Sequence, residues 1–244
     1  MSQQPFQFKK FKVHQDRCAM KIGTDGVLLG AWSSIEHEPK SILDIGAGTG
    51  VVALQLAQRS SASTIDAIEI DDQAHEQCTH NFEHSDWADR LFCYHASVQE
   101  FASEMEHKYD LIVSNPPFFK APKSIDAQTQ NTSQERAVAR FTDTLPFKHL
   151  VVCAAHLLSQ NGVFCTILPQ TEVASFIEIA AQNKLFISKI CTIRGIKTSK
   201  IKRCMLAFSL HQSKPKTQEL IIEVSRHNYT QDYKNLVRDF YVKM

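Results

Sequence analysis

Residues 41–59 read SILDIGAGTGVVALQLAQR, in which an apolar strand, a turn with three alternating glycines and a helix follow one another directly. A glycine-rich turn between a strand and a helix lets the backbone approach a ligand closely, near the helix N-terminus. The nicotinamide fingerprint GxGxxG would need a small residue at position 51, where this chain has Val51. The stretch therefore predicts a strand–turn–helix unit of an open α/β sheet, with a ligand of another kind at its turn.

The rest of the chain continues this alternation of strands and helices. Near-continuous apolar strands that alternate with helices are typical of a parallel sheet covered on both faces. After Pro169, two strands are joined by a short basic link without a helix, so they can pair antiparallel. The pattern predicts an α/β fold with an open, mostly parallel seven-stranded sheet and an antiparallel C-terminal hairpin. The predicted strands are 41–46, 64–70, 91–95, 109–114, 163–168, 185–193 and 204–211, with 219–225 as a possible further strand; the predicted helices are 51–59, 72–82, a segment around 133–140, 145–158, 171–183 and 229–243.

The composition is that of a soluble globular protein. Hydrophobic residues make up 43% and charged residues 22% of the 244 positions. No run of about 18 apolar residues could span a membrane, and the N-terminus has no apolar signal-peptide core, so we expect a cytoplasmic protein. The seven cysteines are scattered without a CxxC pair, and there is no HExxH, so we expect neither a disulfide framework nor a metal site.

The charges are distributed unevenly along the chain. From Lys184 to the end there are 13 Lys/Arg and 4 Asp/Glu, whereas the first 183 residues hold 14 basic and 22 acidic residues. The first 21 residues add a second basic cluster. Such asymmetry indicates a surface that faces a polyanion; the alternative is lysines that are merely solvated on exposed strands.

An acidic residue ends the second predicted strand. Glu69 lies 19 residues after Gly50, and a carboxylate at this strand end can accept both hydrogen bonds of a ribose diol. The alternative is a solvated acid near a loop, which is how we interpret Asp71 and Asp72. The glycine turn upstream favours the ribose role for Glu69.

The fourth predicted strand ends in Ser114-Asn-Pro-Pro-Phe-Phe119. Two prolines stiffen the backbone and leave neighbouring carbonyls free as acceptors. The Asn115 side chain adds an acceptor, and Phe118 adds a stacking face. This set suits a planar group that carries an NH2, whereas a plain proline-ended strand would not require the asparagine.

These motifs resemble those of known enzymes. Asp44-Ile-Gly-Ala-Gly-Thr-Gly50 resembles the first motif of S-adenosylmethionine-dependent methyltransferases, and the NPPF tetrapeptide resembles the motif of methyltransferases that act on amino groups of adenine, cytosine, guanine or glutamine. The segment Phe8–Trp32, with its block Met20-Lys-Ile-Gly-Thr-Asp-Gly26, is similar to the opening of the bacterial tRNA1(Val) (adenine(37)-N6)-methyltransferase family. The resemblance covers nearly the whole chain, including the basic strand link.

The resemblance implies a Rossmann-like class I methyltransferase domain over residues 40–244, with residues 1–39 as an N-terminal cap packed on the cofactor site. It implies in-line methyl transfer from S-adenosylmethionine to the exocyclic amine of the adenine beside the anticodon. The implied catalytic residues are Asn115, Pro116, Pro117 and Phe118; the implied cofactor-binding residues are Lys21, Gly23, Thr24, Asp25, Asp44, Gly46, Gly48, Gly50, Glu69, Ser97 and Asn115. Ser97 stands where many such enzymes have an aspartate for the cofactor's adenine amino group.

A tRNA substrate would use the basic residues, because phosphate contacts supply most of the affinity for nucleic acid. We expect the polar segment 120–134 to form a loop that orders over the substrate. The expected RNA-binding residues are Lys9, Lys10, Lys12, Arg17, Arg136, Arg140, Arg194, Lys197, Lys200, Lys202 and Arg203.

Three alternatives stay open. A guanine-N2 rRNA methyltransferase shares these motifs, but its usual architecture has a second, duplicated domain for which 244 residues leave no room. A glutamine-N5 protein methyltransferase typically has NPPY and a helical domain in front, and the basic C-terminal quarter argues against a peptide substrate. A non-enzymatic RNA-binding module would not need both an intact NPPF and an intact glycine turn.

Overall fold

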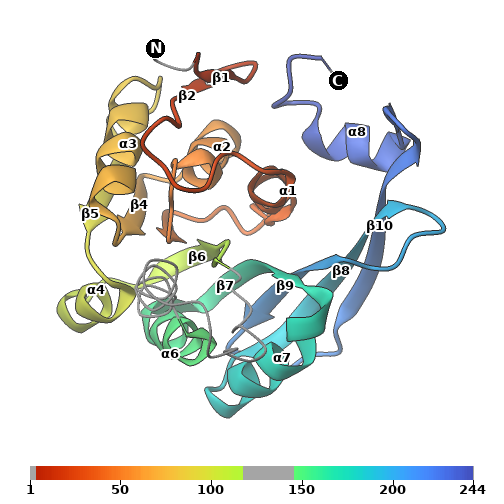
Figure 1. The fold of residues 1–244 in the computed structure, drawn as a ribbon. Coiled ribbons are helices and arrows are strands. Elements are labelled where there is room, and N and C mark those ends of the chain that lie inside the picture. The colour runs from red at the N-terminus through yellow and green to blue at the C-terminus, as the bar shows by residue number, and fades with distance from the viewer. Residues whose placement is uncertain (1–3, 118–145, 244) are drawn as a thin grey trace, which may run out of the picture.

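The computed structural model describes residues 4–117 and 146–243 of the chain. Within these residues the main sheet has nine strands, in the order β11-β10-β8-β9-β7-β6-β3-β4-β5 (Figure 1). Phe118, Arg136, Arg140, the segment 120–134 and the predicted helix around 133–140 lie outside the described residues. The strands are β3 (Ser41–Ile45), β4 (Thr64–Glu69), β5 (Leu91–His95), β6 (Tyr109–Ser114), β7 (Leu158–Pro169), β8 (Phe186–Ile196), β9 (Arg203–Ser209), β10 (Lys216–Ser225) and β11 (Asn228–Tyr229).

The central strands run as the sequence predicts. Strands β5, β4, β3, β6 and β7 pair in parallel, and β9 is antiparallel to both β7 and β8, which confirms the predicted hairpin. The predicted total of seven strands was wrong, although the possible further strand at 219–225 is confirmed as part of β10, which pairs in parallel with β8; β11 pairs with β10. In β10 only Leu220 is fully buried, so this strand carries a weaker apolar signal than the central ones.

Helices cover both faces of the sheet (Figure 1). One layer holds α1 (Thr24–Trp32), α2 (Val51–Arg59), α3 (Asp72–Glu83) and α8 (Gln231–Val237); the other holds α4 (Val98–Glu104), α6 (Phe147–Leu157) and α7 (Val173–Gln182), which follows the short 3-10 turn η1 (Gln170–Glu172). Each layer packs its apolar side chains on the sheet as a separate buried cluster. In the part of the chain that the structure describes, no helix is long and apolar enough to cross a membrane.

Residues 4–23, which we call the N-terminal strap, pack on the layer of α1, α2, α3 and α8. The strap contains the two short strands β1 (Phe6–Gln7) and β2 (Lys12–Val13). Phe8 is fully buried in the same cluster as α1 and α2, and its ring stacks on Phe11 and on Tyr241 near the C-terminus. The strap is therefore part of the core of this layer.

The parallel strands give the sheet two functionally different edges. The carboxyl ends of β3, β4, β6 and β7 lie along one edge, and β9 begins there because Arg203 pairs with Pro169 at the end of β7. β8 and β10 run in the same direction as β7 and end at that edge too. We call it the carboxyl edge and the opposite one the amino edge. Ligands of open α/β sheets bind at the carboxyl edge.

The turn after β3 leads to a prediction about the stability of a Gly50 variant. Gly50 has φ +76°, and a Cβ there would lie 2.6 Å from Cε1 of Phe82 and 2.9 Å from Sγ of Cys78, whose side chains are buried. Gly50→Ala should therefore lose more stability than the roughly 1–2 kcal/mol that a left-handed alanine costs. Urea denaturation measures this loss.

Gly48→Ala is the matched control. Gly48 is also left-handed, with φ +55°, but a Cβ there would meet nothing within 4 Å. Gly48→Ala should therefore lose only the roughly 1–2 kcal/mol of stability that a left-handed alanine costs. Equal losses in the two variants would contradict the steric role assigned to Gly50.

Candidate functional site

The glycine turn between β3 and α2 opens toward space on one side. Gly46, Gly48 and Gly50 all have positive φ, at +71°, +55° and +76°. A Cβ built on Gly46 or Gly48 would meet nothing within 4 Å. The N–H groups of Gly46 and Ala47 donate to the Ile68 carbonyl at 2.9 and 3.1 Å, which fixes the turn against β4. The turn thus leaves room for a ligand above its backbone.

Glu69 is the last residue of β4, and its carboxylate is hydrogen-bonded to the glycine turn. Its Oε2 accepts from the Gly48 N–H at 2.8 Å. Its Oε1 accepts from the N–H groups of Ile70 and Asp71 at 2.9 and 3.0 Å. Three backbone donors therefore hold the carboxylate beside the open side of the turn, where its remaining lone pairs can meet hydroxyl groups.

Asp44 lies beneath the turn. It is 1% exposed, and its Oδ2 accepts from the Ala53 N–H of α2 at 3.2 Å. Burial raises the pKa of Asp44 to about 7; the Ala53 hydrogen bond opposes this shift, and the charge of Glu69 adds to it. Asp44 therefore shapes the turn from the protein side.

Asn115 follows β6 at the same edge and is half-buried, and Pro116 after it is buried. The first turn of α1 lies next to the Asn115 amide, because a Cβ built on Gly26 would be 3.9 Å from Asn115 Nδ2. That same Cβ would be 3.4 Å from Cγ1 of Val51 at the start of α2. The structure thus brings the asparagine, the glycine turn and α1 together.

The start of α1 carries the other predicted cofactor residues. Gly23 is its N-cap, Thr24 begins the helix, and Lys21 precedes both in the strap. Asp25 Oδ2 accepts from Nε of Arg203 at 2.8 Å. This ion pair fixes the start of α1 to β9, so Arg203 contacts a residue of the predicted cofactor site.

Ser97 begins α4, after β5. Its hydroxyl accepts from the Glu100 N–H and donates to Glu100 Oε2 at 2.7 Å, and its own N–H donates to the same oxygen at 2.9 Å. These hydrogen bonds from Ser97 lower the pKa of Glu100. The charged group at this position is therefore the carboxylate of Glu100, which the sequence reasoning did not single out.

Two buried amide side chains on α3 hold the strap in place, and the sequence analysis did not identify either of them. Asn81 accepts from the His14 N–H at 2.8 Å and donates to the carbonyls of His14 at 2.8 Å and of Thr49 at 2.9 Å. Gln77 Oε1 accepts from the Arg17 N–H at 3.2 Å. The strap is thus tied to the glycine turn through Asn81. The available signal was a pair of amides, four residues apart, on the apolar side of a helix.

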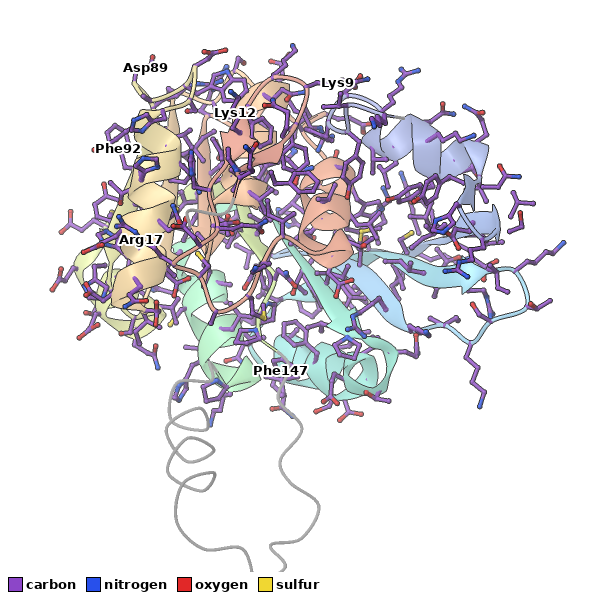
Figure 2. All side chains as sticks on the ribbon, turned by 45° about the horizontal axis from the view of Figure 1, so that its top comes forward. Lys9, Lys12, Arg17, Asp89, Phe92 and Phe147 are labelled. Carbon is purple, nitrogen blue, oxygen red and sulfur yellow. The ribbon has the colours of Figure 1, made fainter. Side chains whose placement is uncertain are left out.

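The strap runs antiparallel to α3, from the amino edge to the carboxyl edge. Figure 2 shows Lys9, Lys12 and Arg17 in this order on the way toward Phe147, with which α6 begins at the carboxyl edge. Burial, reinforced by the charges of Glu69, Asp71 and Asp16, raises the pKa of Cys18 to about 12. The strap therefore reaches the neighbourhood of Glu69.

The predicted RNA-binding residues do not form one surface. Lys9 and Lys10 line a depression of about 530 Å³ at the amino edge, with Ile35, Gln58, Arg59 and Asp239. Lys197, Lys200 and Lys202 are exposed on the link between β8 and β9, at the carboxyl edge.

The two remaining described arginines of that prediction make ion pairs. Arg17 pairs with Glu76 at 2.8 Å, and both side chains are more than half exposed. Arg194 pairs with Glu219 at 2.7 Å and also donates to the Ser199 carbonyl. Arg194 therefore braces the link from within the sheet.

Among residues 4–117 and 146–243, no group of three or more His, Cys, Asp or Glu side chains could hold a metal ion. All seven cysteines are free thiols, and six of them are buried.

Comparison with known proteins identifies the family. The model of the methyltransferase small domain matches residues 23–145. A relative from Christiangramia forsetii, named tRNA1(Val) (adenine(37)-N6)-methyltransferase, is 53% identical over the full length of both chains. One of the same name from Flavobacterium johnsoniae is 52% identical over 98% of this chain and 100% of its own. The chain belongs to the tRNA1(Val) (adenine(37)-N6)-methyltransferase family.

Solved structures agree on the fold. A predicted O-methyltransferase from Agrobacterium tumefaciens superposes with a TM-score of 0.67 at 17% identity, over 88% of this chain and 96% of that one. A putative RNA methyltransferase from Pyrococcus horikoshii superposes with a TM-score of 0.50 at 20% identity, over 75% and 80%. The predicted class I methyltransferase fold and the resemblance to this family are confirmed.

The raised pKa of Asp44 predicts a pH dependence of stability. Because the folded state holds this proton up to about pH 7 and the unfolded state releases it near pH 4, Asp44 lowers the free energy of unfolding as pH rises through that window. Asp44→Asn keeps an acceptor for the Ala53 N–H but does not titrate. Denaturation at several pH values should show a smaller loss of stability between pH 4 and pH 7 in the variant. An unchanged slope would contradict this assignment.

Proposed function

We propose that this chain methylates N6 of adenine 37 in tRNA1(Val), with S-adenosylmethionine as methyl donor. The observation that carries the proposal is the position of Asn115-Pro116-Pro117 at the end of β6, beside the glycine turn and the first turn of α1. The relatives' names favour adenine N6 over guanine N2 or a protein glutamine.

The residues at the carboxyl edge fit the cofactor. The open side of Gly46 and Gly48 has room for it, and the Glu69 carboxylate beside that opening suits a ribose diol. Residues Lys21 to Asp25, at the end of the strap and the start of α1, would cover its methionine end, and the β5 end with Ser97 and Glu100 would meet its adenine. When bound, S-adenosylmethionine supplies a methyl carbon that its sulfonium makes electrophilic.

Asn115 and Pro116 orient the target amine. The Asn115 side-chain oxygen and the Pro116 carbonyl accept its two hydrogens, which localises the nitrogen lone pair toward the methyl group. Pro117 stiffens this segment, and Phe118, outside the described residues, would stack on the base. The NPPF segment contains neither histidine nor carboxylate, so it supplies no base for the proton that the amine loses after transfer.

The target adenine must leave its stack to reach this edge, and an anticodon loop offers a base that is already largely unpaired. Basic residues at the carboxyl edge would meet the phosphates. A tRNA substrate also implies a cytoplasmic location.

Labelled methyl transfer into an unmodified tRNA1(Val) transcript tests the function. Nucleoside mass spectrometry should find the label in N6-methyladenosine, and a transcript with guanine at position 37 should accept none. Label in guanine, or in a protein glutamine, would contradict the proposal.

The role of Asn115 predicts a specific kinetic defect. If its oxygen binds the amine hydrogen most strongly as the nitrogen becomes tetrahedral, Asn115→Ala should lower single-turnover methyl transfer on the order of 100-fold, or about 2.7 kcal/mol. Cofactor and tRNA dissociation constants should change far less, because the glycine turn and the basic link remain.

Asn115→Asp is the companion variant. It keeps an acceptor oxygen and changes the charge, so it should retain partial activity. The rate is measured per folded, cofactor-loaded enzyme. A wild-type rate in Asn115→Ala would rule out the acceptor role and leave Asn115 as an end cap of β6.

A further inference from the structure

The turn between β10 and β11 lies beside the basic link between β8 and β9. β10 pairs in parallel with β8, and Glu223 lies opposite Ile196 at the carboxyl end of both strands. The residues that follow, Arg226 and His227 on one side and Lys197 on the other, therefore project from neighbouring strands at the same edge. We call residues 196–203 and 223–228 together the rim.

The rim has the composition of a surface for RNA. Lys197, Lys200, Lys202 and Arg226 are exposed, and Glu223 is the one acidic residue within these two segments, both of which the structure describes. Glu223 Oε1 accepts from the His227 N–H at 3.2 Å, which partly satisfies its carboxylate within the turn. Arg203 of the rim is paired with Asp25, but the exposed lysines and Arg226 still leave an excess of positive charge, which attracts a polyanion.

Two exposed apolar side chains lie on the same rim. Val224 is 68% exposed and Ile196 is 39% exposed. Cationic side chains that flank apolar ones offer both phosphate contacts and surface for a base or sugar.

The link is held in shape before any partner binds. Arg194 joins Glu219 of β10 to the Ser199 carbonyl in the link. The Ser199 hydroxyl donates to the Ile196 carbonyl at 2.8 Å and accepts from the Ile196 N–H at 3.2 Å. A preformed surface loses less conformational entropy on binding.

We propose that the rim binds the phosphate backbone of the RNA that flanks the target base, and that Arg226 and His227 belong to this interface. The proposal rests on the proposed function. Asn115 follows β6, and four strand spacings separate β6 from β10. At the usual spacing of strands, this is a distance of about 19 Å. The RNA therefore crosses the sheet along its carboxyl edge, over β7, β9 and β8, and leaves the lysines of the amino edge uncontacted.

A pair of double charge reversals tests the proposal. Lys200→Glu with Arg226→Glu changes the rim, and Lys214→Glu with Lys216→Glu is the control. Lys214 and Lys216 are exposed at the start of β10, on the amino edge, so both variants change the net charge equally. The measurement is binding of unmodified tRNA1(Val) transcript across a series of salt concentrations, with S-adenosylhomocysteine affinity as a check on the cofactor site.

The rim variant should bind tRNA at least tenfold more weakly, and its log–log salt slope should be shallower by about 1.4 to 1.8 for two lost phosphate contacts. The control should keep the wild-type slope, and both should keep the wild-type affinity for S-adenosylhomocysteine. Equally weakened tRNA binding in both variants would mean that only the net charge matters. Unchanged tRNA binding in both variants would mean that the rim does not contact the RNA. Either result would overturn the proposal. Wild-type protein that neither binds nor methylates the transcript would instead contradict the proposed function.

Discussion

The hydrogen bond from the Gly48 N–H to the Glu69 carboxylate joins the ends of β3 and β4, and the site is arranged around it. Gly48 has a left-handed backbone at this point, and β4 ends at Glu69, beside the turn. The same geometry leaves the open side of the turn beside a carboxylate, and it directs α2 back across the sheet. Because β3, β4 and β6 are parallel, Asn115, which follows β6, lies at the same edge of the sheet.

The N-terminal strap depends on this arrangement in turn. Asn81 uses both of its amide hydrogens and its oxygen to hold the backbone of His14 against the Thr49 carbonyl in the turn. Just beyond the strap, in the first turn of α1, Asp25 pairs with Arg203 of β9. The segment that enters α1 is thus fixed at two points, one on the turn and one on the antiparallel strand. The strap is therefore held beside the glycine turn, although most of its length packs on α3.

The sequence could predict the features that local patterns determine. The strand ends before Gly46 and before Asn115 follow from apolar runs interrupted by glycine and proline, and the shared carboxyl edge follows from parallel strands. It could not predict pairings between distant segments. β10 is mostly exposed and joins the sheet by pairing with β8, and Glu100 forms hydrogen bonds with Ser97 at the start of α4. A count of charges along the chain also could not separate Lys9 from Lys200, because only the fold places them at opposite edges.

In the proposed function, the cofactor binds at the carboxyl edge, between the glycine turn, Glu69 and the strap. Amide hydrogen exchange of the full chain, with and without S-adenosylhomocysteine, tests this position. We expect new protection in residues 20–25, 46–50 and 69–71, and none at Lys9, Lys10, Gln58 and Arg59 on the amino edge. Protection at the amino edge, with the glycine turn and the strap unchanged, would contradict a cofactor site at the carboxyl edge.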